Sequence, residues 1–216
     1  MRTMLSCRLS SSILGAFLIV LTGCASSPPS RFYQLNPVNP QTVAKQDSPS
    51  QGNVIVAVGP IRIPDYLDRP QIVTRSGQNE LKLSEFDRWA GSLENDIILA
   101  LVDGISSQLP GDRFSVMRWS PLLESKVPSS YRIEVQIIRF EGTPGGSVTL
   151  RALSGIFGKD RGLLFHREFG ISEQVSGSSY DDLIDAMSKA LESLSRNIAE
   201  EMKAVVQRDD EMRKKG

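Results

Sequence analysis

The stretch YRIEVQI, Tyr131 to Ile137, decides the fold, because apolar and polar residues alternate strictly along it. This period of two is typical of a strand that buries one face and exposes the other. Two further stretches follow, GGSVTLRAL (145–153) and GLLFHREFGISEQV (162–175), and we expect them to form an antiparallel pair. The segment between them, SGIFGKDRG (154–162), contains three glycines and predicts a flexible tip.

Downstream of these strands the period changes to that of a long amphipathic helix beginning near Tyr180. Ser179 and Asp182 fit a capping box at its start. Its apolar stripe has seven members at spacings of three and four: Leu183, Met187, Leu191, Leu194, Ile198, Met202 and Val205. We expect the domain to end at residue 207, followed by a charged tail without regular structure over 208–216.

Upstream, a second helix is predicted from Ser84 to about Leu109, with Asp87 as the capping-box partner of Ser84. Its stripe is Phe86, Trp89, Leu93, Ile97, Leu101 and Ile105. Before it, QIVTR (71–75) and LKLS (81–84) predict a hairpin around the turn SGQN (76–79).

The remaining strands are short or apolar on both faces. VIVAVGPIRI (54–63) predicts an interior strand, RFSVMRW (113–119) another strand and RFYQL (31–35) a short one, with 36–53 as a loop. Together these elements predict one α+β domain over residues 31–207. We expect a mostly antiparallel or mixed sheet with two amphipathic helices packed on one face.

The N-terminal apolar run, Ile13 to Leu21, is about ten residues long, half the length that a membrane-spanning helix needs. With Arg2 and Arg8 before it, the run predicts a signal peptide over 1–23. Leu21-Thr22-Gly23-Cys24 resembles the lipobox of bacterial lipoproteins, which implies cleavage after Gly23 and lipidation of Cys24. An ordinary signal peptide with a chance cysteine is the alternative.

The anchor and the tether set the expected location of the domain. Ala25 follows the cysteine in place of the aspartate that, by analogy with enterobacterial lipoproteins, favours retention in the inner membrane. We therefore expect the periplasmic face of the outer membrane of a Gram-negative bacterium. The lipidated tether, residues 24–30, is rich in serine and proline and reaches about 25 Å at most, so the domain stays near the bilayer.

Charge and cysteine content exclude several classes of function. Removal of residues 1–23 leaves 23 basic and 25 acidic residues, a formal net charge of −2 and no excess of basic charge for binding nucleic acid. The only cysteines are Cys7, in the signal peptide, and Cys24. The mature domain therefore has neither a thiol nor a disulfide and depends on its apolar core.

The sequence offers little for catalysis. His166, the single histidine, has the opposite parity to its apolar neighbours in its strand and should point away from the core. One histidine and no usable cysteine make a zinc site improbable, and Gly142–Gly146 lacks the lysine of a phosphate-binding loop. We expect neither an enzyme nor a bound metal or cofactor.

Two regions carry a resemblance to a known family. They are VGPIRIPDYLDRPQIVTRSGQNELKLSEFDRWAGSLENDI (58–97) and VQIIRFEGTPGGSVTLRAL (135–153) together with YDDLIDAMSKALESLSRNIAEEM (180–202). They resemble the PqiC-type lipoproteins, auxiliary lipoprotein subunits of ABC-type transport systems built around MCE-domain proteins. This chain departs from the family at LSGIFG (153–158), where members often carry a tryptophan.

The resemblance implies a non-catalytic subunit on the inner leaflet of the outer membrane. It implies that the protein docks the periplasmic end of an MCE assembly that conducts lipids across the envelope. It implies a periplasmic MCE-domain protein as partner and membrane attachment through the lipid anchor. The expected polar face of the sheet and the long helix permit a homo-oligomer. A lipid-binding shuttle with a pocket between helices and sheet, and a structural cell-envelope lipoprotein, are the alternatives.

Three groups of residues are candidates for binding the partner. The loop 65–69 is bounded by prolines that stiffen an extended chain, and its residue types are common at interfaces: Asp65, Tyr66, Leu67, Asp68 and Arg69. Asp87 and Arg88 face water on the predicted helix, and Ile156 and Phe157 lie at the predicted tip. The alternatives are a loop laid over the sheet edge, with Arg69 paired to Asp65 or Asp68, and a tip folded over as a cap.

Overall fold

The structure is a computed structural model that describes residues 28–35 and 54–215. The predicted signal peptide, Cys24 and the predicted loop 36–53 lie outside these residues. Its elements are β1 (Arg31–Tyr33), β2 (Val54–Arg62), β3 (Gln71–Arg75), β4 (Leu81–Trp89), α2 (Leu93–Gln108), β5 (Phe114–Arg118), α3 (Pro121–Lys126), β6 (Tyr131–Gly142), β7 (Ser147–Gly158), β8 (Gly162–Gln174) and α4 (Tyr180–Lys215).

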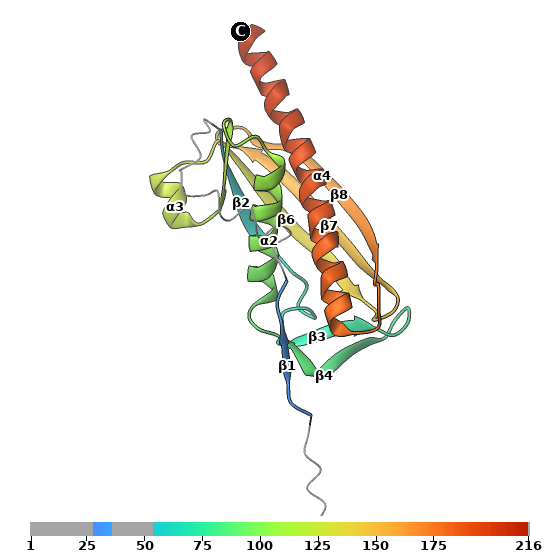
Figure 1. Cartoon of the computed structure of the whole chain (residues 1–216). Helices are drawn as coiled ribbons and strands as arrows, with labels where there is room; N and C mark the ends of the chain where they lie inside the picture. The colour runs from blue at the N-terminus through green and yellow to red at the C-terminus, as the bar shows by residue number, and fades with distance from the viewer. Residues whose placement is uncertain (1–27, 36–53, 216) are drawn as a thin grey trace, which may run out of the picture.

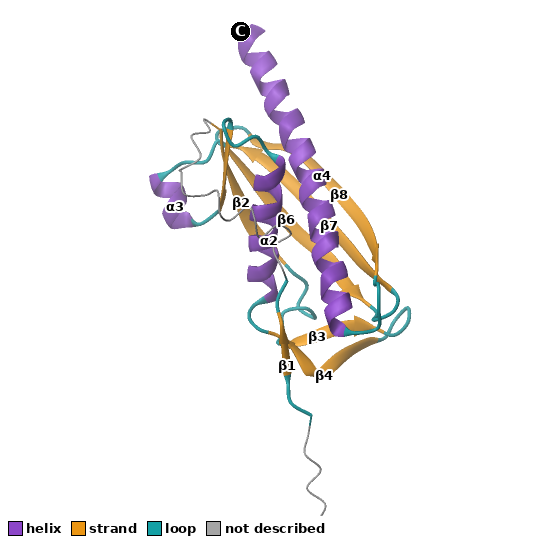
Figure 2. Cartoon of the chain, in the orientation of Figure 1, coloured by secondary structure: helices purple, strands orange, loops and turns teal. Residues whose placement is uncertain are grey.

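The strands form one mixed sheet of eight strands, with α2 and α4 side by side on one face (Figures 1 and 2). The expected α+β class with both long helices on one face is confirmed. Six strands follow the order β1-β4-β3-β6-β2-β5, and β7 and β8 continue the sheet from β6. The β6-β7-β8 meander is antiparallel, as expected, whereas β2 runs parallel to both β5 and β6.

The core lies between the helices and the sheet. Ile133, Val135 and Ile137 of β6 are at most 2% exposed, as the alternation predicted. All seven predicted stripe residues of α4 are buried. The start of the helix is also confirmed, because the Ser179 hydroxyl accepts a hydrogen bond from the Asp182 N–H at 3.1 Å.

The two long helices pack closely, because α2 has a glycine where they cross. A Cβ atom added at Gly104 would lie 2.5 Å from Oγ of Ser195 on α4, which is too short for any real contact. Both residues are buried. The crossing therefore depends on a small residue in each helix.

The predicted start of the first long helix is wrong. Ser84 to Trp89 belong to β4, and α2 begins at Leu93, where the Ser92 side chain accepts from the Asn95 N–H. The Ser84 hydroxyl still accepts a hydrogen bond from the Asp87 N–H at 3.0 Å, but inside a strand. Residues 87–89 pair with β1, and β4 also pairs with β3, so strand pairing overrides a local helical signal.

The predicted tip between β7 and β8 is also shorter than expected. β7 continues to Gly158, and residues 159–161 alone make the turn, which Gly162 completes at φ +67°. Ile156 is 1% exposed and pairs with Ile133, so it is a core residue and not part of a tip. Phe157 points to the opposite face of the sheet, as alternation along a strand requires.

The C-terminal tail is helical. α4 runs to Lys215, and Asp209 within the expected tail is 4% exposed. Figure 1 shows the last turns of α4 extending past the sheet, at the end opposite to β1. The structure also has a short helix that the pattern did not predict, α3, with Ser120 as its N-cap and Pro121 in its first turn.

Candidate partner-binding surfaces

The loop 63–70 is fixed to the sheet by its inner side. Tyr66 donates a hydrogen bond from its hydroxyl to Oε2 of Glu141 at 2.7 Å. Leu67, its neighbour, is 2% exposed and belongs to the core. The structure thus places two of the five predicted loop residues in structural roles.

Glu141 lies at the end of β6 and is completely buried. Its Oε1 lies 2.8 Å from Nε of Arg75 and 2.8 Å from Nε of Arg139. Burial raises the pKa of Tyr66 well above its ordinary value, and the hydrogen bond to this carboxylate raises it further. Glu141 was not a predicted site residue, because two of its partners, Tyr66 and Arg75, come from segments far from it in the sequence.

The outer side of the same loop is polar. Asp65 and Asp68 are exposed and Arg69 is half-buried. Within the described residues Arg69 makes no ion pair with either aspartate, so the expected alternative pairing is not seen. These three side chains are the part of the loop that a partner could contact, and that role stays a prediction.

The second predicted group, Asp87 and Arg88, also contains one residue with a structural role and one that stays partly accessible. Asp87 is 5% exposed, forms an ion pair with Arg31 at 2.7 Å and accepts a hydrogen bond from the Tyr33 hydroxyl at 3.2 Å. Burial and this hydrogen bond raise the pKa of Tyr33. Asp87 therefore ties β1, the strand next to the tether, to β4, while Arg88 is half-buried.

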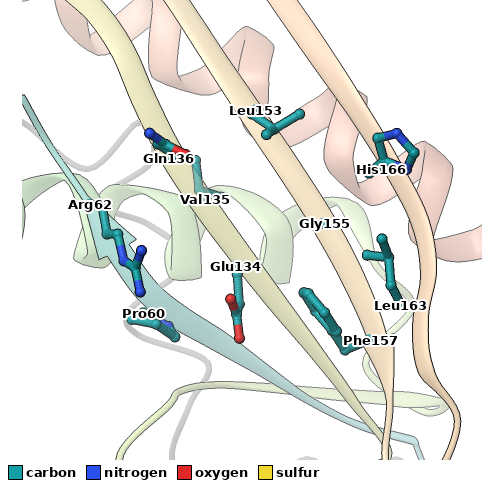
Figure 3. Close-up of a pocket in the computed structure, with 10 residues that line it drawn as sticks. All are labelled: Pro60, Arg62, Glu134, Val135, Gln136, Leu153, Gly155, Phe157, Leu163 and His166. Carbon is teal, nitrogen blue, oxygen red and sulfur yellow. The ribbon is translucent and has the colours of Figure 1, made fainter.

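A groove of about 290 Å³ lies on the sheet face opposite the helices. Figure 3 views this face with the helices behind the strands. The groove is lined by Pro60, Arg62, Glu134, Val135, Gln136, Leu153, Gly155, Phe157, Leu163 and His166. Phe157, the predicted contact residue, is half-buried here, whereas its neighbour Ile156 faces the core.

The groove exists partly because Gly155 has no side chain. A Cβ atom there would lie 3.0 Å from the Phe157 ring and 3.3 Å from Cδ1 of Leu163, so these two side chains lean across the glycine. His166 is exposed on this face, which confirms that it points away from the core. Leu153 is apolar at an outward position of β7, whereas Leu163 has the parity of the inward Phe165 and reaches the groove because the β7–β8 register shifts between Ile156 and Phe157. The sequence therefore contains a signal for only part of the groove.

A second cluster of hydrogen bonds holds α4 to the β7–β8 turn. Asp209 of α4 accepts hydrogen bonds from Arg161, in the β7–β8 turn, and from the Tyr131 hydroxyl. The hydrogen bond from Arg161 holds the pKa of the Asp209 carboxyl below its ordinary value. Burial and the bond to Asp209 raise the pKa of Tyr131. The turn and the C-terminal helix are thus held together by one carboxylate.

No helix among residues 28–35 and 54–215 is long and apolar enough to cross a membrane. The same residues contain no group of three or more histidine, cysteine, aspartate or glutamate side chains that could hold a metal ion.

The family model of ABC-type transport auxiliary lipoprotein components matches residues 33–199, and the chain belongs to this family. It is 26% identical over 184 residues to a protein named intermembrane transport lipoprotein PqiC in Escherichia coli (strain K12). That alignment covers 85% of this chain and 92% of the relative. The protein of the same name in Shigella flexneri matches with the same values.

Solved structures share the fold. A crystal structure of an uncharacterized protein superposes with a TM-score of 0.64 at 20% identity, covering 81% of this chain and 99% of the other. The crystal structure of a protein from Xanthomonas campestris gives a TM-score of 0.63 at 16% identity, covering 84% and 99%. At these identities the similarity concerns the fold alone.

Proposed function

We propose that this protein is a non-catalytic outer-membrane lipoprotein that docks an MCE-type intermembrane lipid transport system. The single observation that supports this most is the match to the auxiliary lipoprotein family across residues 33–199. The similarity to intermembrane transport lipoproteins named PqiC, which covers 85% of the chain, supports the same transport class. The lipobox at Leu21–Cys24 supports attachment through Cys24.

The position of the tether then orients the domain on the membrane. Pro28 lies four residues after Cys24, a reach of at most about 14 Å. Figure 1 shows β1, the first described strand after the tether, together with β3 and β4 at one end of the domain, and the end of α4 on the opposite side. In this proposal the β1 end faces the bilayer and the C-terminal end of α4 faces the periplasm.

The docking surface in this proposal includes the outer side of the loop 63–70. Tyr66 and Leu67 hold the loop on the sheet, so Asp65, Asp68 and Arg69 are presented on a fixed backbone. A surface that is already ordered loses little conformational entropy on binding, which favours affinity. Asp68→Ala with Arg69→Ala should remove partner contacts without removing either of the two contacts that hold the loop.

The test is affinity purification of the full-length lipidated protein after mild cross-linking in cells, followed by mass spectrometry. We expect an MCE-domain protein to co-purify with the wild type. Recovery should fall with Cys24→Ser, which prevents anchoring, and with the Asp68→Ala, Arg69→Ala double variant. The charge-matched control is Glu200→Ala with Lys203→Ala, two exposed positions on α4, where recovery should not change.

The structural alternative predicts a different result in the same experiment. A structural cell-envelope lipoprotein would bring cell-wall fragments and no MCE-domain protein. If the double variant at 68 and 69 loses its fold in a thermal denaturation measurement, the loop is a structural segment and not a docking surface. Equal recovery from the double variant and the control would also contradict the assignment of the loop.

A further inference from the structure

We propose that the groove on the helix-free face of the sheet binds one acyl chain of an anionic phospholipid, with its phosphate at Arg62. This inference deepens the proposed function, because it rests on a location at the membrane. It differs from the expected shuttle pocket, since the groove does not lie between the helices and the sheet. It also gives the domain its own contact with lipid.

The groove continues along β6 toward the loop 63–70. A second hollow of about 240 Å³ adjoins the first and shares Arg62 and Gln136 with it. The second hollow is completed by Ile63, Pro64, Ile137 and Ile138. Phe157, which lines the groove, pairs with Arg132 of β6, and Arg62 pairs with Gln136. Between these two pairs the path follows four residues of β6, about 13 Å. A single acyl chain spans about half of the roughly 30 Å hydrocarbon core of a bilayer, so most of a chain whose phosphate lies at Arg62 fits along this path.

The lining of this path is mostly apolar and is not shielded from solvent. Leu153 is 37%, Leu163 51% and Ile138 37% exposed, and all three lie on the helix-free face. Side chains of this size gain free energy when they are removed from water. Several such residues gathered around one groove therefore favour an apolar occupant.

The charges around the groove favour an anion. Glu134 is compensated by Arg132, whose Nη2 lies 3.0 Å from Oε1 of that glutamate. Arg62 is exposed, lines both hollows and has no ion-pair partner among the described residues. Its guanidinium can bind a phosphate through two parallel hydrogen bonds. Figure 3 shows Arg62 and His166 on opposite sides of the apolar lining.

A lipid fits this site better than an extended polypeptide does. The groove lies on the face of the sheet, where the strands present side chains and not main-chain groups. A peptide strand laid in it would lose water from its own N–H and C=O groups without gaining partners, which is unfavourable. A hydrocarbon chain carries no such groups and needs only apolar contacts.

The experiment places a photoreactive residue in the groove of the full-length protein in cells. Leu153→p-benzoyl-phenylalanine is compared with Leu99→p-benzoyl-phenylalanine, which puts the same group on α2 at a leucine of similar exposure, 43% against 37%. Cells are grown with radioactive phosphate, which labels their phospholipids, and the protein is purified under denaturing conditions after irradiation. We expect label at Leu153 and little at Leu99.

A second variant tests the phosphate contact. Arg62→Glu should lower the label at Leu153 about tenfold, because it replaces an arginine–phosphate contact with repulsion. Lys203→Glu, an exposed charge reversal on α4, should leave it unchanged. Equal label at Leu153 and Leu99, or no effect of Arg62→Glu, would overturn the proposal.

This labelling, compared with the affinity purification after mild cross-linking described under the proposed function, distinguishes the two proposals. An adduct of higher mass without label at Leu153 would mean that a protein or a second copy of this chain covers the groove. Loss of lipid labelling with the MCE-domain protein still co-purifying would reject the groove and retain the docking role. Lipid labelling at Leu153 without co-purification of the MCE-domain protein would support the groove and reject the docking role.

Discussion

At the residue scale, Glu141 connects the loop 63–70 to the sheet. Its buried carboxylate accepts from Tyr66 and contacts Arg75 and Arg139, so its removal leaves two guanidinium groups without their anion. Both arginines are partly exposed, which lowers the cost below that of a fully buried pair. We predict that Glu141→Gln lowers the free energy of unfolding by about 2–3 kcal/mol.

Chemical denaturation of the wild type and the variant measures this difference. Glu168→Gln is the matched control, because Glu168 pairs with Arg151 and both side chains are about half exposed. An exposed pair of this kind contributes at most about 1 kcal/mol. Similar losses from the two variants would contradict the structural role of Glu141.

The Asp209 cluster predicts a pH dependence. The folded-state pKa of Asp209 is lowered, so its contribution to stability is present above the unfolded pKa and is lost as the pH falls through the folded value. Asp209→Asn should therefore destabilise the protein at pH 7, and the difference from the wild type should shrink in acid. Denaturation midpoints measured from neutral to acidic pH test this, and a constant difference would reject it.

At the element scale, the crossing of α2 and α4 makes Gly104 necessary. Alanine favours a helix over glycine by about 1 kcal/mol. Gly104→Ala should nevertheless lower the melting temperature, because overpacking typically costs about 1–3 kcal/mol and the new Cβ would meet Ser195. In a Ser195→Gly background the same change should be neutral or stabilising. Independent effects of the two substitutions in thermal denaturation would contradict the close crossing.

The C-terminal turns of α4 give a second prediction at this scale. A chain that stops after Asp210 keeps Asp209, whereas one that stops after Gln207 loses the acceptor of Tyr131 and Arg161. We expect the shorter chain alone to lose stability, by about 1–3 kcal/mol, since the buried hydroxyl of Tyr131 is left without its partner. Equal melting temperatures would show that residues 208–210 are dispensable.

The sequence predicted the elements whose pattern agrees with their surroundings and missed those where tertiary contacts decide. The alternation of Tyr131–Ile137 and the apolar stripe of α4 were sufficient to predict these two elements, because one face of each is buried. Ser84 and Asp87 form the expected contact, yet pairing with β1 and β3 keeps them in a strand. The short α3 carried a readable signal, Ser120 followed by Pro121, which is typical of a helix start.

The candidate site was less predictable, for the same physical reason. Side chains adjacent in sequence have different roles: Tyr66 and Leu67 are fixed inward, and Asp65 and Asp68 are exposed. The groove gathers residues from β2, β6, β7 and β8, and although β7 and β8 were expected to pair, no local pattern shows that β2 and β6 lie beside them. The family, by contrast, could be predicted, because its motifs are contiguous stretches of sequence.

At the scale of the whole molecule, different faces of one domain make different contacts in the proposed function. The long helices cover one face of the sheet and complete the core, and the opposite face carries the groove. In the proposed orientation, the β1 end lies near the bilayer and the loop 63–70 presents polar side chains to a partner. A domain organised in this way would join a membrane to a protein assembly without performing a reaction.

The most direct test of the docking role is a photo-cross-link from the loop itself. Asp68→p-benzoyl-phenylalanine in the full-length protein is irradiated in cells, and the adduct is identified by mass spectrometry, with Glu200→p-benzoyl-phenylalanine as the control on α4. The account predicts an adduct with an MCE-domain protein from position 68 and none from position 200. A stable, correctly located protein that gives no such adduct from position 68 would contradict it.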